Sequence, residues 1–197
     1  GVQTCALPIL KNLLGQTIAA SLLLTGTLKF SGRLSIHARG EGPLKLLMAE
    51  ATDQRKFRAI ANWSDTVEEG AALADMLGSA QLAITIDPEK GARYQGIVPL
   101  ERETLSGCIA HYFEMSEQLD TFLLLGADED GAYGLLLQKM PGNEKVTDQD
   151  GWNRIIQLAK TLTIDELASN DNETLLFRLF HEEKLLPYEL ESVKFEC

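Results

Sequence analysis

The stretch from Leu10 to Thr25 reads as a helix with apolar side chains on nearly every face. Leucine, isoleucine and alanine recur all round it, and Lys11 is its only charged residue. A helix that lies on a membrane surface would carry a strongly charged face, which this stretch lacks. A helix that is apolar all round is instead buried on every side. We therefore predict a central core helix that the rest of the chain must cover.

The residues after this helix alternate with a period of two, which is typical of strands with one buried face. The clearest case is Gln81–Leu100, in which two alternating runs flank a turn at Asp87–Gly91. We predict a wide hairpin there. Gly96 in the returning strand indicates a bulge or a close backbone approach, because no helix pattern follows it directly. Further strands are predicted at 27–39, 44–49, 57–63, 121–125 and 133–139.

The chain is acidic, with a formal net charge of −11 at pH 7. Its own field would repel nucleic acid phosphates and an anionic membrane surface, so we exclude both as partners. The longest apolar runs fall short of the ~20 residues that a membrane span needs, and no export signal is evident. The composition is that of a globular protein of one domain plus an appendage, or of two small domains.

Three cysteines, Cys5, Cys108 and Cys197, are too few and too scattered for a disulfide framework, which favours a reducing compartment, the cytoplasm. Cys108 lies on the apolar stripe of a predicted helix at 104–118, so we interpret it as a buried, unreactive thiol. His111 stands three residues further on. That adjacency leaves open the alternative hypothesis that the protein is a small cytosolic hydrolase or transferase that uses Cys108 or one of the His/Glu pairs. We assign no catalytic and no cofactor-binding residue.

Three other patterns approach known motifs but lack a required residue. The Gly40–Pro43 turn contains Gly-x-Gly, but Lys45 stands where a nucleotide-binding loop has its third glycine. The stretch His181–Leu185 begins like a zinc-protease helix but ends in leucine instead of the second histidine. The acids of Asp128–Asp130 are not spaced as calcium ligands. We therefore predict none of these three sites.

The pattern changes from strands to helices after the Met140–Asn143 turn, and we place a domain boundary there. It separates a core domain, 10–142, from a helical linker, 143–196, with helices predicted at 152–162, 164–168 and 172–186. The linker helices have narrow apolar stripes, so we expect them to be less stable than the core. Residues 1–9 read like a translated sequencing adapter, and we treat them as a non-native segment.

Seven short stretches resemble, in order and at similar spacing, the heat shock protein 33 family of redox-regulated chaperones. They are Leu22–Arg33, Gly40–Leu47, Gly91–Val98, Tyr112–Leu119, Leu135–Pro141, Leu179–Glu183 and Val193–Cys197. The resemblance implies an α+β fold in which two mostly antiparallel sheets enclose a buried helix, followed by a helical linker. It also implies an ATP-independent holdase, not an enzyme, that binds unfolded or partly unfolded client proteins under oxidative stress. Whether the protein forms a homodimer stays open at this point. A purely structural dimerisation module is a third hypothesis.

The resemblance further implies a zinc domain after the linker, in which a Cys-x-Cys pair and a later Cys-x-x-Cys pair hold one metal. Cys197 matches the first of these four ligands and starts that domain, and the other three are absent from this sequence. A single thiolate does not make a closed zinc site. We therefore expect zinc in the full-length protein and none bound to this chain. In the family, oxidation forms disulfides, zinc leaves and the linker loses its fold.

Overall fold

The structure is a computed structural model that describes residues 8–29, 31–64, 67–68, 70–140, 150–186 and 189–196. Cys5 and Cys197 lie outside these residues, as does the Pro141–Asn143 part of the predicted domain boundary. Pro8 and Ile9, which we assigned to the non-native segment, form the start of the first helix.

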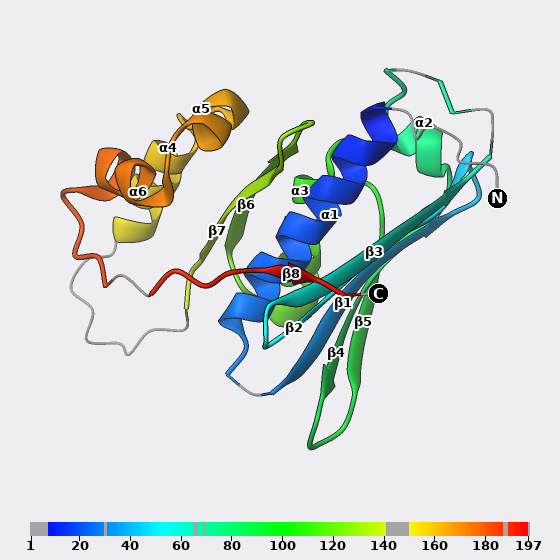
Figure 1. Cartoon of the computed structure of the whole chain (residues 1–197), viewed down its shortest axis with the longest axis horizontal. Helices are drawn as coiled ribbons and strands as arrows, with labels where there is room; N and C mark the ends of the chain where they lie inside the picture. Colours follow the sequence, from blue (N-terminus) through cyan, green and yellow to red (C-terminus); the bar gives the residue numbers. More distant parts are fainter. Residues whose placement is uncertain are drawn as a thin grey trace.

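Helix α1 (Pro8–Thr27) runs through the middle of the molecule, between a six-stranded and a two-stranded sheet (Figure 1). The α+β fold, with two sheets around a buried helix, is therefore confirmed. The few polar side chains on the buried faces of α1 bond to its own backbone. Thr17 Oγ1 donates to Leu13 O at 2.7 Å, and Thr25 Oγ1 donates to Ser21 O at 2.6 Å. These bonds let the hydroxyls enter the core without losing a partner.

The six-stranded sheet has the order β5-β4-β1-β2-β3-β8 and is antiparallel except between β3 and β8. Its inner face packs apolar side chains such as Leu34, Ile36 and Leu82 towards α1. The predicted hairpin of 81–100 is present as β4 and β5. The strands are β1 (Gly32–Gly40), β2 (Leu44–Thr52), β3 (Lys56–Trp63), β4 (Ala80–Pro88), β5 (Tyr94–Pro99) and β8 (Lys194–Phe195), and a short helix α2 (Leu73–Leu77) precedes β4.

The second sheet pairs β6 (Thr121–Ala127) with β7 (Ala132–Gln138) on the other side of α1. Helix α3 (Leu105–Tyr112) leads into β6 and ends in a π-helical turn, Phe113–Glu117. The helix predicted at 104–118 is thus present, with its last turn wound more widely.

Three helices follow at the predicted linker positions: α4 (Gly151–Ala159), α5 (Ile164–Ser169) and α6 (Asn172–Phe180). Helix α6 ends six residues earlier than predicted, in a turn in which the Glu183 N–H donates to Phe180 O at 2.9 Å. None of the described helices is long and apolar enough to cross a membrane.

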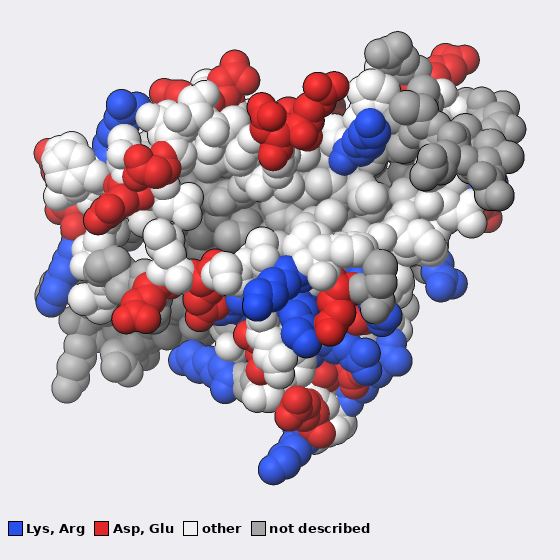
Figure 2. Space-filling model, in the orientation of Figure 1, with Lys and Arg blue, Asp and Glu red and all other residues white. Residues whose placement is uncertain are grey.

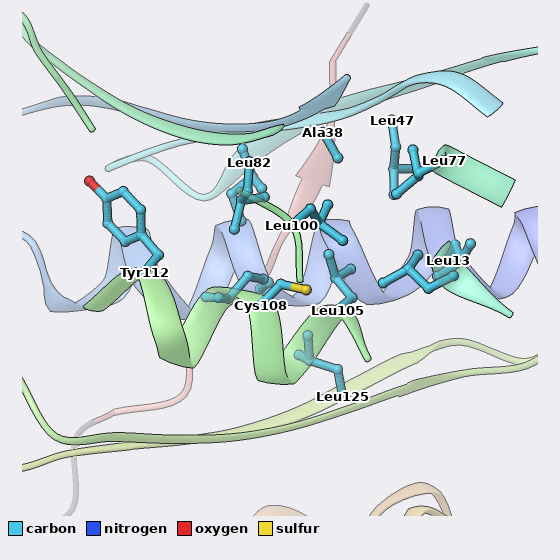
Figure 3. Packing of buried hydrophobic residues seen from close by; sticks show 14 of the residues in the cluster. Leu13, Ala38, Leu47, Leu77, Leu82, Leu100, Leu105, Cys108, Tyr112 and Leu125 are labelled. Atoms are coloured by element: carbon cyan, nitrogen blue, oxygen red, sulfur yellow. The ribbon is translucent and has the colours of Figure 1, made fainter. Parts of the chain in front are cut away.

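Gly96 lies where a side chain, rather than another backbone, approaches β5 closely. A Cβ atom at this position would stand 2.4 Å from the Tyr112 hydroxyl and 2.7 Å from its ring. Tyr112 is buried on α3, on the same helix as Cys108 and Leu105 (Figure 3). The predicted bulge or backbone approach is thus replaced by a close approach of the tyrosine ring of α3, and the β4–β5 register runs unbroken through Gly96.

We expect the Gly96→Ala substitution to destabilise the fold by about 1–3 kcal/mol, because the new methyl group overlaps the buried Tyr112 ring. Gly26→Ala is the control: a Cβ atom there meets nothing within 4 Å, and alanine favours a helix. Urea unfolding of both variants measures the difference. Equal stability of the two variants would show that Tyr112 moves aside freely.

Candidate functional site

The two-stranded sheet β6–β7 has an apolar core on each of its faces. On the inner face, Leu123, Leu125 and Leu136 belong to the main core around α1. On the outer face, Leu124, Tyr133 and Leu135 pack against the buried Leu162, Leu167 and Leu175 of the linker. Because successive side chains of a strand point to opposite faces, one pair of strands serves both cores. Figure 1 shows α4, α5 and α6 on the side of β6–β7 that faces away from α1.

A glycine on each face brings the helices close to this sheet. A Cβ atom at Gly126 would lie 2.5 Å from Ile164 Cγ2 of α5, and one at Gly134 would lie 2.6 Å from Leu23 Cδ1 of α1. The residues opposite these glycines in the β6–β7 ladder are Tyr133 and Leu125. The missing side chains therefore make room for α5 on one side and for α1 on the other.

The linker helices begin with strong local signals. Thr163 and Glu166 form a capping box at the start of α5, and the Asp171 side chain accepts from the Thr174 N–H at 2.9 Å at the start of α6. Backbone N–H groups that donate to these carboxylates lower the pKa of both Glu166 and Asp171. The N-cap of α6 is Asp171, directly before the predicted start of this helix at 172.

An ion pair joins the first and last parts of the linker. Arg154 on α4 donates to Glu183 through Nε at 2.6 Å and through Nη2 at 3.1 Å. Helices this short are not stable in isolation, so tertiary contacts must hold them. Among the described residues from 150 to 196, the buried apolar residues are Ala159, Leu162, Leu167, Leu175 and Phe180.

The same segment exposes large apolar side chains over its second half. Phe177, Leu186 and Leu190 are 68%, 78% and 88% exposed. Leu176, Leu185, Val193 and Phe195 are exposed as well. We call this set the apolar linker surface. These exposed side chains are spread along one segment of the chain, from α6 to β8, where they are available for contact with another molecule.

The last described residues cover one edge of the six-stranded sheet, which the sequence did not predict. Strand β8 pairs with the start of β3, and the Glu196 and Glu191 carboxylates form ion pairs with Lys56 and Arg55. Figure 2 shows basic and acidic side chains gathered together where this strand lies. The only local signal is the alternation of Val193, Lys194 and Phe195, which is too short to identify a strand.

Cys108 is buried as predicted. It is 1% exposed, and its sulfur points into the core beside Leu100 and Leu105 (Figure 3). The thiol donates to the Arg102 carbonyl at 3.4 Å, and burial raises its pKa. A cysteine nucleophile needs a lowered pKa or a neighbouring base, and this thiol has a carbonyl as its hydrogen-bond partner.

The three histidines lie in separate settings. His37 is half-buried on the outer face of β1, 3.2 Å from Ser35 Oγ, and burial lowers its pKa, with the charge of Arg39 adding to the effect. His181 stacks near Phe177 at the end of α6. His111 Nδ1 lies 3.2 Å from Arg102 Nη2 and 3.4 Å from Glu114 Oε2.

His111 also lines an open cleft between α3, the β6–β7 sheet and α4. Its ionisable lining residues are Arg102, His111, Glu114, Asp120, Lys139 and Lys160. Several of these already pair with one another, as Lys139 does with Asp120 at 3.7 Å. No cysteine or serine is among the described residues that line the cleft. Cys108 is therefore not part of this cleft, whereas His111 and Glu114, one of the His/Glu pairs, both line it.

The described part of the chain contains no group of three or more His, Cys, Asp or Glu residues placed to hold a metal ion. Cys197, the predicted first zinc ligand, lies outside it.

Comparisons with known proteins identify close relatives. The family model described as Hsp33 protein matches residues 5–197. Proteins named 33 kDa chaperonin from Pseudomonas fluorescens (strain SBW25) and Ectopseudomonas mendocina are each 46% identical over 190 residues, which is 94% of this chain. That from Azotobacter vinelandii is 45% identical over 191 residues, also 94% of this chain. The chain spans 63% of the Pseudomonas and 64% of the other two relatives.

A solved structure has the same fold. The crystal structure of the 33 kDa chaperonin (heat shock protein 33 homolog) from Thermotoga maritima matches with a TM-score of 0.81 at 24% sequence identity. The match covers 98% of this chain and 69% of that one. It supports the arrangement of two sheets around a central helix.

We expect Cys108 to resist thiol reagents in the native protein, because burial excludes the reagent and the raised pKa keeps the sulfur protonated. The measurement is the rate of labelling at neutral pH in a variant in which Cys5 and Cys197 are replaced by serine. Labelling should become fast only when denaturant unfolds the core. Fast labelling without denaturant would place Cys108 in an accessible, activated site.

Proposed function

The chain belongs to the Hsp33 family, and from this premise we propose that it is the client-binding part of an ATP-independent holdase chaperone. Such a protein binds unfolding proteins under oxidative stress and prevents them from aggregating. The relatives of known name support this proposal, since each is called a 33 kDa chaperonin. The proposal includes a cytoplasmic location and unfolded proteins as partners. It does not depend on whether the chain forms a homodimer.

The apolar linker surface is the observation that carries the proposal. A holdase needs exposed apolar area and no catalytic residue, and Phe177, Leu186 and Leu190 supply such area on one segment. Each leucine contributes about 1.5–3 kcal/mol when a partner buries it fully. The net charge of −11 keeps a chain with this surface soluble and argues against nucleic acid as the ligand.

The docking of the linker on β6–β7 supports a second part of the proposal, in which client binding increases when the linker leaves. Departure of α5 and α6 would uncover Leu124, Tyr133 and Leu135, which belong to the core-side half of the shared cluster. The main core would keep its own inner-face leucines. A loss of linker structure therefore adds apolar surface without unfolding the rest of the protein.

Redox control is the part of the proposal that lies beyond the residues of this chain. A closed zinc site needs four ligands, and this sequence has three cysteines, one of which is buried in the core. The residues present therefore do not fit a zinc site, and we derive no step through a metal. We propose that zinc and its redox response belong to the longer protein, with Cys197 as the first ligand.

We expect the chain to suppress aggregation of a thermally unfolding client equally well with and without ATP. Replacing Leu186 and Leu190 together by serine should weaken client binding about tenfold, the equivalent of 1.4 kcal/mol. The control replaces Ile60 and Ile97, which are exposed on the six-stranded sheet, by serine. Light scattering during client unfolding measures both pairs.

Two outcomes would contradict this account. The wild-type chain could fail to suppress aggregation at any ratio to client, which would remove the holdase function. The control pair could instead be the one that loses activity, which would move the client site from the linker to the sheet.

Because this chain has one of the four expected zinc ligands, we also expect it to suppress aggregation equally well under reducing conditions and with peroxide.

A further inference from the structure

The outer edge of β3 is a sheet edge that only a very short strand covers. In the described part of the chain, β8 is the only strand beyond β3, and it pairs with Lys56 and Phe57 alone. The Lys194 N–H donates to Arg55 O at 2.9 Å, and the Glu196 N–H donates to Phe57 O at 3.0 Å. The edge therefore accepts an extended segment in parallel orientation through main-chain hydrogen bonds.

Side chains add a specific pattern to this main-chain pairing. The Phe195 ring packs edge-on against Phe57, with ring centroids 5.8 Å apart. The Glu196 carboxylate pairs with Lys56 Nζ at 3.0 Å, and Glu191 forms an ion pair with Arg55. The edge thus presents two adjacent basic residues followed directly by an aromatic ring. Its ligand carries an aromatic residue followed directly by an acid, with a second acid four residues before the aromatic ring.

The segment that occupies the edge is held only weakly. Phe195 remains 63% exposed, and the Glu191 and Glu196 side chains are more than half exposed. Exposed ion pairs contribute little, about 0–1 kcal/mol each, and the ladder has two residues. A covering strand of this kind can be displaced by a better ligand of the same chemistry.

We propose that the β3 edge is a binding site for an extended client segment with this acid–aromatic–acid pattern, and that residues 191–196 occupy it as an internal competitor. The naming of the partner as a client rests on the proposed holdase function; the edge site itself does not. Unfolded chains offer the required ligand, because their backbone N–H and C=O groups bond only to water and can exchange these bonds for bonds to a sheet edge.

The test uses a fluorescent peptide with the sequence of residues 189–196 and the full chain with Lys194→Pro. Proline has no N–H, so this variant loses the bond to Arg55 O and frees the edge. The matched control is Val193→Pro, because the Val193 N–H makes no bond to β3. Fluorescence anisotropy measures the affinity of the peptide for each protein.

We expect Lys194→Pro to bind the peptide about tenfold more tightly than the wild-type chain or the control, because the tethered competitor is removed. Adding Arg55→Glu and Lys56→Glu to this variant should abolish the gain. A peptide with serine in place of its phenylalanine should bind no better to Lys194→Pro than to the wild-type chain. The variants Glu191→Gln and Glu196→Gln together, with Glu189→Gln as control, repeat the test without changing the backbone.

Three results would overturn the proposal. Lys194→Pro could fail to gain peptide binding, or binding could survive the charge reversal, which would place the peptide elsewhere. Lys194→Pro could also split a wild-type dimer without gaining peptide affinity, which would assign the edge to a second copy of the chain. Client aggregation, measured on the same variants, separates the two claims: peptide binding without any suppression contradicts the holdase function and leaves the edge site standing.

Discussion

The two-stranded sheet β6–β7 is the element on which the rest of the structure depends, because each of its faces completes a different apolar core. Leu123 and Leu125 close the space around α1 on one side. Leu124 and Leu135 give the linker helices their only large apolar platform in the described chain. Glycines at 126 and 134 let a helix approach from each side. The two clusters share this sheet but no residue, and we propose that the linker cluster can open while the core around α1 stays folded.

This proposed difference in stability underlies the proposed function. The core domain buries α1 between two sheets, with long antiparallel strands on one side. The linker consists of three short helices, an ion pair between Arg154 and Glu183, and a surface rich in exposed leucine and phenylalanine. Local opening occurs where few apolar contacts hold a segment. We therefore propose that a client meets apolar side chains on the segment that opens at the lowest cost.

Local patterns predicted much of this arrangement. The apolar faces of Leu10–Thr25 predicted the central helix, the alternation in Gln81–Leu100 predicted the β4–β5 hairpin, and Cys108 was correctly placed in the core. Apart from such neighbouring strands, the sequence did not predict which elements meet. Two residues of β8 carry too little signal to identify pairing with β3, more than 130 residues away. The strand at 121–125 was predicted, but its burial on both faces was not. The unbroken apolar run Phe122–Leu125 could have indicated this, because such a run is typical of strands buried on both faces.

Native-state hydrogen exchange, compared between Leu175→Ala and Leu176→Ala, tests the separate stability of the two cores most directly. Leu175 is buried in the linker cluster and Leu176 is 37% exposed. Truncation of a buried leucine costs about 2–5 kcal/mol. The account predicts that Leu175→Ala strips protection from the amides of α5 and α6, that β4 keeps its own, and that Leu176→Ala changes little. An equal loss of protection in β4 would show that linker and core unfold as one unit, and would contradict the account.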